Sequence, residues 1–334
     1  MHRHRLGRRA ALGLATTLAL PGLALPTLAR AQGAPFPDRN PRYVVPFPPG
    51  GLTDIMARFL GQKLSETWGK AVLIDNRAGG NALIGADIAA KAPPDGHTLL
   101  AITLTHAVNA TMFPNAPYDF RRDFHVISLL GSLPLVVVVN AEKSPARDLA
   151  GLVAQMRTAP MSGGSSGNGS PPHLGLELLR RVTNAGDRLT HVPYRGGAPS
   201  VTDLAGGTLD VMVSNLPECL AQIRGGRLRA LAITSAERHK LVPEVPTVRE
   251  LGMPNLEITN WTAVLTQAAV PAPLKTRLEH DILAAMRDPD MVRRAEEAGF
   301  QVLGWDSNRS TRFVAQETDR WASLVTEAQI RPDA

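Results

Sequence analysis

The sequence contains a single cysteine, Cys219, among 334 residues. One thiol excludes an internal disulfide and any zinc site built on several cysteines. A lone cysteine in an exported chain is typical of a small buried side chain rather than a nucleophile. Nine histidines are present, but none has the His-x-x-x-His or His-Glu-x-x-His spacing of a metal site. We therefore expect neither a metal nor a catalytic zinc.

Signatures of nucleotide and nucleic-acid binding are also missing. There is no Gly-x-Gly-x-x-Gly fingerprint, and no glycine-rich loop is followed by the lysine of a phosphate-binding loop. The chain has 36 Lys and Arg against 30 Asp and Glu, but five of the basic residues and no acidic ones fall in residues 1–31. The remainder is nearly neutral, so we expect no cofactor and no nucleic-acid partner.

Residues 1–31 have the pattern of an export signal. Arginines at the start precede an apolar stretch, and Ala29-Arg30-Ala31 is a small-x-small cleavage site. We expect cleavage after Ala31. The sequence Gly7-Arg8-Arg9-Ala10 resembles a twin-arginine signal, which leaves that route and the general secretory route open. No later stretch reaches about 18 uncharged apolar residues, so we expect the mature chain to be soluble.

Strand and helix patterns alternate along the mature chain, which predicts an α/β fold with mostly parallel sheets and helices on both faces. We expect strands at 42–46, 71–75, 98–103, 189–192, 209–214, 228–234, 261–266 and 301–305. We expect helices at 55–68, 84–92, 149–157, 173–182, 201–204, 273–298 with a break near Pro289, and 310–329. The apolar stretch 126–140, interrupted by Pro134, is either two strands or one strand that runs between two domains. Residues 161–172 are expected to form a loop.

Three glycine-rich segments each follow an expected strand and precede an expected helix. They are residues 46–54 (loop one), 163–173 (loop two) and 193–200 (loop three). Glycine lets a ligand approach the backbone, and the free N–H groups at a helix N-terminus bind anions. Thr53 or Asp54 can cap the first helix, and Ser170 with Pro171 suits the start of the second. Because ligands bind at the carboxyl ends of strands in such sheets, two facing blocks would grip a small anion.

The absence of a lysine after the glycines favours a carboxylate over a phosphate. We expect loop one to anchor it, through Phe47, Pro49, Gly50, Gly51, Thr53 and Asp54. Contacts that set specificity are expected at strand ends and in loops, at Thr103, Thr105, Ser165, Ser166, Ser214 and Asn215. The remaining candidates lie in loops two and three and are Asn168, Ser170, Tyr194, Gly196 and Ala198.

An exported serine hydrolase is the alternative that the residues leave open. Gly163-Gly164-Ser165-Ser166-Gly167 matches Gly-x-Ser-x-Gly, with Ser165 or Ser170 as the nucleophile. A nucleophile elbow needs a strand directly before the serine and a helix directly after it. No strand is expected before Ser165 and two prolines delay the helix, so we expect no catalytic residue. His106 and His173 are expected to be structural.

Several of these segments, taken together, resemble the Bug (TctC-like) family. These proteins are the extracytoplasmic solute receptors of tripartite tricarboxylate transporters. The similarity covers residues 40–330 and is carried by 45–58, Asp75-Asn76-Arg77, Ile84-Gly85-Ala86, 94–100, 167–170, 191–196, 203–207 and 245–248. The resemblance implies a two-domain, type II-like periplasmic binding protein fold with a hinged ligand cleft. We expect domain 1 to be residues 32–135 and 262–334, and domain 2 to be 136–261.

The resemblance also implies a function. It implies a periplasmic, monomeric receptor, not an enzyme, that captures a small carboxylated solute and delivers it to integral-membrane permease subunits. A binding protein that serves a signalling partner instead is an alternative that the sequence leaves open. In the family, the loop matching Gly50–Asp54 holds a ligand carboxylate, and those matching Ser165–Ser170 and Tyr194–Pro199 close from the other domain.

This chain departs from the family pattern at two places. Asn81 and Ala82 stand where the family often has two glycines, so the backbone of that loop is expected to differ. Ser214 stands where an aspartate is common, which removes a negative charge from the expected cleft. Ligand identity therefore does not transfer from relatives, least of all for amino acids, whose ammonium group needs a carboxylate partner.

Overall fold

The protein is described here by a computed structural model that covers residues 36–332. The expected export signal and its cleavage site at Ala31 lie outside the described residues. The strands are β1 Arg42–Val45, β2 Leu73–Asn76, β3 Thr98–Thr103, β4 Phe124–Asn140, β5 Met161–Ser165, β6 Leu189–Pro193, β7 Val211–Asn215, β8 Leu228–Ile233, β9 Thr259–Gln267 and β10 Gln301–Trp305. They join in the order β2-β1-β3-β9-β4-β7-β5-β6, with β10 and β8 also paired to β4.

Ten α-helices and two short 3-10 helices connect these strands within residues 36–332. The α-helices are α1 Leu52–Trp68, α2 Leu83–Ala90, α3 Leu104–Met112, α4 Leu149–Thr158, α5 Pro171–Thr183, α6 Gly197–Gly206, α7 Leu216–Arg224, α8 Ala272–Met286, α9 Pro289–Glu297 and α10 Ser307–Glu327. The 3-10 helices are Gly186–Arg188 and Pro254–Leu256. The expected break at Pro289 is confirmed, because Asp288 caps α9 and Pro289 is its first residue.

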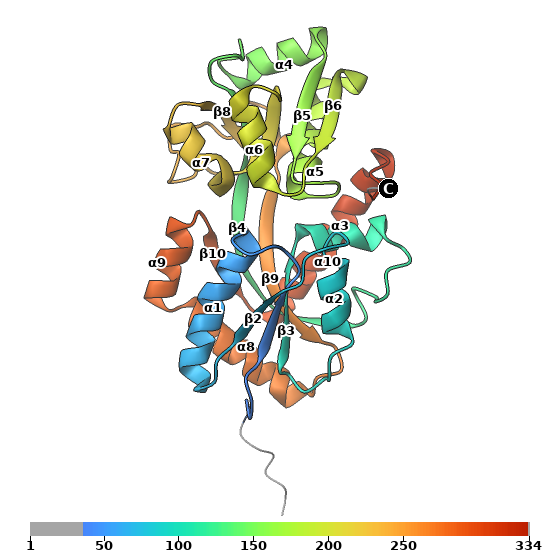
Figure 1. The fold of residues 1–334 in the computed structure, drawn as a ribbon, viewed down its shortest axis with the longest axis vertical. Helices are drawn as coiled ribbons and strands as arrows, with labels where there is room; N and C mark the ends of the chain where they lie inside the picture. Colours follow the sequence, from blue (N-terminus) through green and yellow to red (C-terminus); the bar gives the residue numbers. More distant parts are fainter. Residues whose placement is uncertain (1–35, 333–334) are drawn as a thin grey trace, which may run out of the picture. The chain divides into compact units, whose positions relative to one another are not determined.

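The long strand β4 belongs to two groups of strands, and Figure 1 shows it running through both. Its first part, Phe124–Pro134, pairs with β9, and its last part, Leu135–Val139, pairs with β7. Of the two interpretations of residues 126–140, one continuous strand is therefore correct. Pro134 does not interrupt the strand but sits at the point where the partner changes.

The parallel pairing expected from the βαβ pattern is present in each group. In the first group β1 pairs in parallel with β2 and β3, and in the second β5 pairs in parallel with β6 and β7. Strands β4, β8, β9 and β10, which complete and join the groups, pair antiparallel. We call β1, β2, β3, β9, β10 and the first part of β4 the first strand group, and β5–β8 with the last part of β4 the second strand group.

Alternation along the strands explains why helices cover both faces of each group. Tyr43 and Val45 of β1 pack with α1, α8 and α9, whereas Val44 between them packs with the side of α2, α3 and α10. Figure 1 shows these two sets of helices on opposite sides of the first group. In β4, Val136 and Val138 likewise pack with α6 and α7, and their neighbours pack with α4 and α5. Because both faces are buried, these strands are continuously apolar.

The helices and strands differ from the expectations at three places. Residues 161–165 form β5 instead of a loop, and α3 and α7 were not expected at all. In β5, a Cβ on Gly164 would lie 2.4 Å from Leu209 Cδ1, so the glycine is there because a side chain packs directly on the strand. Helices α3 and α7 each begin at the residue directly after a strand ends, so no linker segment separates strand from helix in the sequence.

Candidate functional site

The carboxyl ends of the parallel strands in the two groups point towards the same short part of β4. Strand β3 ends at Thr103, which is opposite Thr262 of β9, and Thr262 is opposite Gly131 of β4. From the other side β7 ends at Asn215, opposite Leu135 of β4. Gly131 and Leu135 are four residues apart on β4, which corresponds to about 13 Å along the strand. The two sets of strand ends therefore face each other across β4, as a site for a small ligand requires.

Loop one leaves the end of β1 and enters α1 through glycine. Gly50 has φ +80°, and Gly51 is the helix N-cap with φ −76°. The expected capping by the side chain of Thr53 or Asp54 is wrong, because no side chain caps the helix and both residues lie inside its first turn. The first-turn N–H groups of an α-helix have no acceptor within the helix. Gly50 and Gly51 are exposed, so a ligand can reach the backbone here.

Asp54 holds loop one in shape. Its buried carboxylate accepts hydrogen bonds from the backbone N–H of Gly50 at 2.9 Å, Nε of Arg58 at 2.8 Å and Nδ2 of Asn76 at 2.9 Å. Burial alone would raise the pKa of Asp54, but these three donors hold it below its ordinary value. Because the carboxylate takes the Gly50 N–H and is paired with Arg58, we assign Asp54 to positioning the loop rather than to contact with an anion.

The other predicted residues of loop one flank this turn. The ring of Phe47 lies edge-on to His106 of α3, with 5.9 Å between centroids, and its carbonyl accepts from Asn76 at 3.1 Å. Pro49 is exposed beside the glycines, and Thr53 is buried. Helix α2 supports the loop from below, because a Cβ on Gly85 would lie 2.6 Å from Cβ of Pro46. Close helix packing therefore fixes where loop one begins.

Loop two runs from the end of β5 to the start of α5. Ser170 is the N-cap of α5 and Pro171 its first residue, as predicted. The hydroxyl of Ser170 donates to the carbonyl of Gly167 at 2.6 Å and accepts from the N–H of His173 at 3.4 Å. Ser166 differs from Ser170, because its Oγ is buried and has no hydrogen-bond partner among the described residues. Ser166 is thus the serine of loop two whose hydroxyl is not engaged by the described residues; Asn168 lies between Ser166 and Ser170.

Ser165 has a histidine partner that sequence reasoning did not expect. Its Oγ lies 2.6 Å from Nε2 of His191 and within 3.2 Å of the backbone N and O of Gly167. The His191 ring stacks on His173, with 3.7 Å between centroids. The expectation that no strand precedes Ser165 is wrong, since β5 ends there, but the helix begins only at Pro171. Ser165 is completely buried, so a substrate cannot reach its hydroxyl in this conformation.

Loop three connects β6 to α6 and lies against loop two. Gly196, with φ +111°, is the N-cap of α6, and its N–H donates to the carbonyl of Ser166 at 3.3 Å. Ala198 is exposed in the first turn of that helix. The hydroxyl of Tyr194 donates to Asp203 at 2.6 Å, and this hydrogen bond raises the pKa of Tyr194 to about 12. The backbone N–H groups of Tyr194 and Gly196 donate to the carbonyls of Ser165 and Ser166, so loop three is tied to loop two through its backbone.

The end of β7 carries one predicted pair and one residue that was missed. Ser214 and Asn215 are buried, and Oδ1 of Asn215 accepts from Nδ2 of Asn260 in β9 at 3.2 Å, which links the two strand groups. Glu218, in the first turn of α7, places its carboxyl beside them. Asn215 followed by Pro217 is a helix-start signal that could have revealed this residue.

At the end of β3, the two predicted threonines, Thr103 and Thr105, are joined by a hydrogen bond at the start of α3. Thr103 is the N-cap of α3 and accepts from the N–H of Thr105, which lies in the helix and not in a loop or at a strand end as expected. Nδ1 of His106 accepts from the N–H of Thr103, and burial lowers the pKa of His106 to about 3, so the ring is neutral. His173 accepts from the N–H of Gly169 in the same way. Both histidines hold backbone, as predicted.

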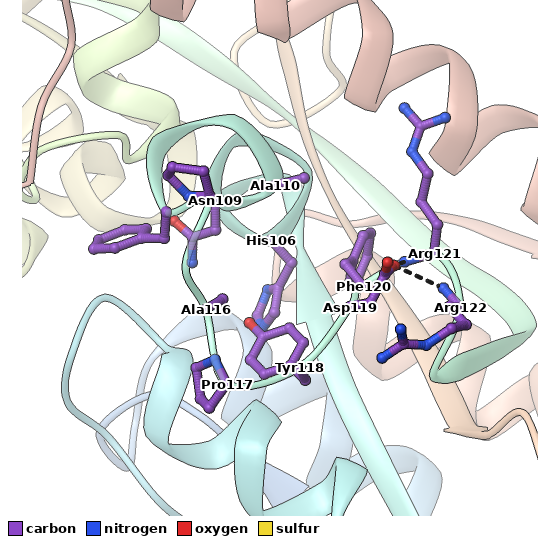
Figure 2. Close-up of a pocket in the computed structure, with 12 residues that line it drawn as sticks. His106, Asn109, Ala110, Ala116, Pro117, Tyr118, Asp119, Phe120, Arg121 and Arg122 are labelled. Atoms are coloured by element: carbon purple, nitrogen blue, oxygen red, sulfur yellow. Dashed lines mark hydrogen bonds between the residues drawn. The ribbon is translucent and has the colours of Figure 1, made fainter.

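Two cavities lie away from these loops. One, of about 420 Å³, is lined by α3 and the segment after it, and Figure 2 shows His106 and Tyr118 at its wall. The other, of about 580 Å³, lies between β10, the end of α9 and residues 235–240, and Ser132 and Pro134 of β4 and Thr259 of β9 also line it. Neither is lined by any of the predicted ligand residues. We place the candidate site at the facing strand ends, because loop one exposes its backbone at one of them and the described residues leave the buried hydroxyls of Ser166 and Ser214 without partners at the other.

Metal and membrane features were also searched in the part of the chain that the structure describes. No group of three or more His, Cys, Asp or Glu side chains in residues 36–332 is arranged to hold a metal ion. No helix in this range is long and apolar enough to cross a membrane. Cys219 is buried, with its Sγ 3.4 Å from the carbonyl oxygen of Leu216, which confirms it as a small buried side chain.

The fold and the facing strand ends define a class of protein, the periplasmic binding proteins. Rpa4515 of R. palustris, determined with adipate, superposes with a TM-score of 0.81 at 32% identity, over 89% of this chain and 100% of that one. MatC of Rhodopseudomonas palustris, determined with bound malate, superposes with a TM-score of 0.78 at 28% identity, over 87% of this chain and 100% of that one.

The family follows from the sequence comparisons. Residues 56–330 match the tripartite tricarboxylate transporter family receptor, TctC. A UPF0065 protein in the tcbD-tcbE intergenic region of Pseudomonas sp. (strain P51) is 38% identical over 99% of both chains. BugT of Bordetella pertussis is 36% identical over 93% of this chain and 94% of its own. The chain belongs to the TctC family of solute-binding receptors, which confirms the resemblance to Bug proteins.

Proposed function

We propose that the protein captures a small carboxylated solute between its two strand groups in the periplasm and delivers it to integral-membrane permease subunits. The observation that carries this proposal is the convergence of strand ends on residues 131–135 of β4, with the exposed glycine turn of loop one on one side. Malate and adipate in the two solved relatives are both carboxylates, and they support the same ligand class here.

Loop one would hold the carboxylate without a basic side chain. The N–H groups at the start of α1 point from the exposed turn, and the positive end of the helix dipole favours an anion. Asp54 keeps Gly50 in place, and its own charge is offset by Arg58. Ser166, loop three and the end of β7 would contact the ligand from the second group. Thr103 and Thr105 would shape the floor.

We propose that the two groups act as domains, with residues 32–135 and 262–334 in one and 136–261 in the other. The change of partners on β4 falls at Pro134 and Leu135, and the return crossing is next to Thr259, the first residue of β9. Closure about these crossings would bring loops two and three onto the ligand. The closed, monomeric form would be the one that the permease recognises.

The experiment that tests the anchor is Gly51→Leu, read by a thermal-shift screen. A Cβ at Gly51 would be 3.5 Å from the carbonyl oxygen of Pro48, an ordinary contact, and φ is negative, so the variant should fold. Its side chain covers the first-turn N–H groups. Unfolded and refolded wild type should gain about 2.7 kcal/mol from a true ligand at 100 times its Kd, and the variant should gain nothing. A Gly51→Ala control should keep partial binding; normal binding by Gly51→Leu would refute the anchor.

An exported hydrolase remains the second candidate, because Ser165 and His191 lie within hydrogen-bond distance. The complete burial of Ser165 and its ties to Gly167 count against it, and Ser170 is engaged as a cap. A fluorophosphonate probe should therefore leave the protein unlabelled. Labelling that Ser165→Ala abolishes would establish the hydrolase and overturn the receptor. A signalling partner in place of the permease would show as capture of a sensor protein by the ligand-bound form.

A further inference from the structure

Three polar atoms near the ends of β5 and β7 are buried and have no hydrogen-bond partner among residues 36–332. They are Oγ of Ser166, Oγ of Ser214 and Oε2 of Glu218; Ser214 lies beside the Glu218 carboxyl, but these two atoms do not meet in hydrogen-bond geometry. A buried polar atom without a partner is destabilising, so three close together need an explanation. They lie at the ends of β5 and β7, where the ligand is proposed to bind.

The strand register places the three residues at the same end of the second strand group. Gly163 and Gly164 of β5 pair in parallel with Val211 and Met212 of β7, and two residues further along each chain stand Ser166 and Ser214. Glu218 lies in the first turn of α7, the helix that follows β7, and its carboxyl is next to Ser214 and Asn215. The Ser166 carbonyl accepts from Gly196, which precedes Gly197. The cluster therefore joins loop two, loop three and the start of α7.

Gly197 makes the place that the Glu218 carboxyl occupies. A Cβ on Gly197 would lie 2.1 Å from Oε2 and 2.4 Å from Cδ of Glu218. The carboxyl therefore rests directly on the backbone of loop three, and any other residue at 197 would push it away. Since φ of Gly197 is not in the left-handed region, glycine is needed there for space and not for backbone conformation.

No cation among residues 36–332 balances the Glu218 carboxyl. Titratable groups lie on the helix that carries Glu218 and on the segments packed around this residue. They are Cys219 and Arg224 of α7, Asp203 of α6, Arg229 of β8, Arg195 of loop three, and His239, Lys240 and Glu296 beyond Pro217. Arg229 donates to the carbonyls of Ala141 and Ala146. Asp203 accepts from Tyr194, and Lys240 pairs with Glu296. β4 and β7 contribute no charge beside it. Burial raises the pKa of the Glu218 carboxyl to about 7. The polar side chains of Asn215 and Ser214 beside it act in the opposite direction and lower this pKa, but by less.

We propose that Glu218 is a specificity-determining residue that binds, in its protonated form, the second acidic group of a dicarboxylate. This rests on the proposed function, in which loop one holds the first carboxylate. The carboxyl O–H donates to the distal carboxylate, and the hydroxyls of Ser166 and Ser214 donate beside it. When a dicarboxylate binds to protein in which Glu218 is ionised, Glu218 must take up one proton from solvent. Glu218 thus returns an acidic group to the region where Ser214 replaces the aspartate common in the family.

The test compares ligands that differ only at the far end. The probes are adipate, 6-aminohexanoate and hexanoate, with succinate, 4-aminobutanoate and butanoate as a shorter set, measured by calorimetry at pH 6, 7 and 8. The diacid of one set should bind more tightly than its amino and methyl counterparts. A group with a pKa near 7 is about tenfold less protonated at pH 8 than at pH 6, so the Kd should weaken about tenfold. The heat should vary with buffer as one proton is taken up.

Two variants locate the effect at Glu218. Glu218→Gln keeps a donor and loses the titration, so the diacid should bind within about threefold of wild type at pH 6 and its Kd should no longer change up to pH 8. Gly197→Ala moves the carboxyl, so it should weaken the diacid more than tenfold and leave the monoacid unchanged. Glu244→Gln, at an exposed glutamate, is the matched control and should behave as wild type.

Three results would overturn the proposal. Tighter binding of the amino acid with release of a proton would make Glu218 a partner for a cation. An unchanged pH dependence in Glu218→Gln would place the residue outside the site. Absence of diacid binding would refute the dicarboxylate site; the wider carboxylate screen then separates the two proposals. Shifts by other carboxylates that Gly51→Leu abolishes would leave the proposed receptor standing, and no shift by any carboxylate would refute both.

Discussion

Removal of the Asp54 carboxylate should loosen loop one and destabilise the fold by a measurable amount. The carboxylate is 2% exposed and accepts from Gly50, Asn76 and Arg58. Hydrogen bonds to a charged group contribute about 1.5–3 kcal/mol each, and an ion pair with a solvent-exposed partner less than about 1 kcal/mol. Because the Arg58 side chain is 51% exposed, it can rehydrate. Asp54→Ala should therefore lower the free energy of unfolding by about 3 kcal/mol.

The pH dependence provides the refuting result. The pKa of Asp54 is lowered in the folded protein, so its contribution is complete above the unfolded value of about 3.9 and is lost as pH falls through the folded value. Urea unfolding at pH 7 and pH 3 should show the difference between wild type and Asp54→Asn shrinking in acid. An equal difference at both pH values would refute the role of the charge. Thr67→Ala, on the exposed face of the same helix, should show no such pH dependence.

Two further substitutions test backbone and packing near the site. Ala82 has φ +72° at the N-cap of α2, and a left-handed non-glycine residue costs about 1–2 kcal/mol. Ala82→Gly should therefore raise the free energy of unfolding by about 1 kcal/mol in urea titration; a loss would show that the buried methyl group outweighs the strain. Gly85→Ala should destabilise by about 1–3 kcal/mol, because its Cβ would overlap Pro46 and the carbonyl of Arg77. It should also weaken ligand binding through loop one, whereas Gly206→Ala, which meets no atom, should do neither.

Many strands and helices were predictable from the sequence because the signals that mark them are local. Strands β3 and β10 have the predicted bounds, since apolar runs between polar turns mark strands without tertiary help. The start of α5 was predicted from Ser170 and Pro171 for the same reason: a cap and a first-turn proline act within one turn. These signals need no knowledge of what packs on them.

Elements that depend on distant packing were not predictable. The glycines of β5 read as a loop, yet Gly163 meets Leu176 of α5 and Gly164 meets Leu209. In the first part of α5, Gly175 is likewise required by Val213, since its Cβ would lie 2.5 Å from Cγ1. Close approach of a helix to a strand selects glycine on both, and only the assembled structure shows which helix approaches.

The sequence indicated the three loops at the strand ends but not how the side chains of these loops are hydrogen-bonded. The sequence placed Ser165, Ser166 and Ser170 together, and the structure separates them by hydrogen bonding: two are engaged by the protein and Ser166 is not. Glu218 was missed because its helix was missed. Asn81 and Ala82 keep left-handed backbone without glycine, and the Asn81 amide is held by Asn109 at 3.0 Å. Which residues substitute for glycine depends on such contacts.

The long crossing strand also has a consequence for how the chain folds. Strand β3 pairs with β9, which is synthesised about 160 residues later, and β9 in turn pairs with the first part of β4. Contacts between such distant residues make folding slow, because the intervening chain must be ordered first. Until β9 arrives, one edge of β3 has unpaired N–H and C=O groups that can pair with another chain. The interval before β9 docks is therefore when this protein is most exposed to aggregation.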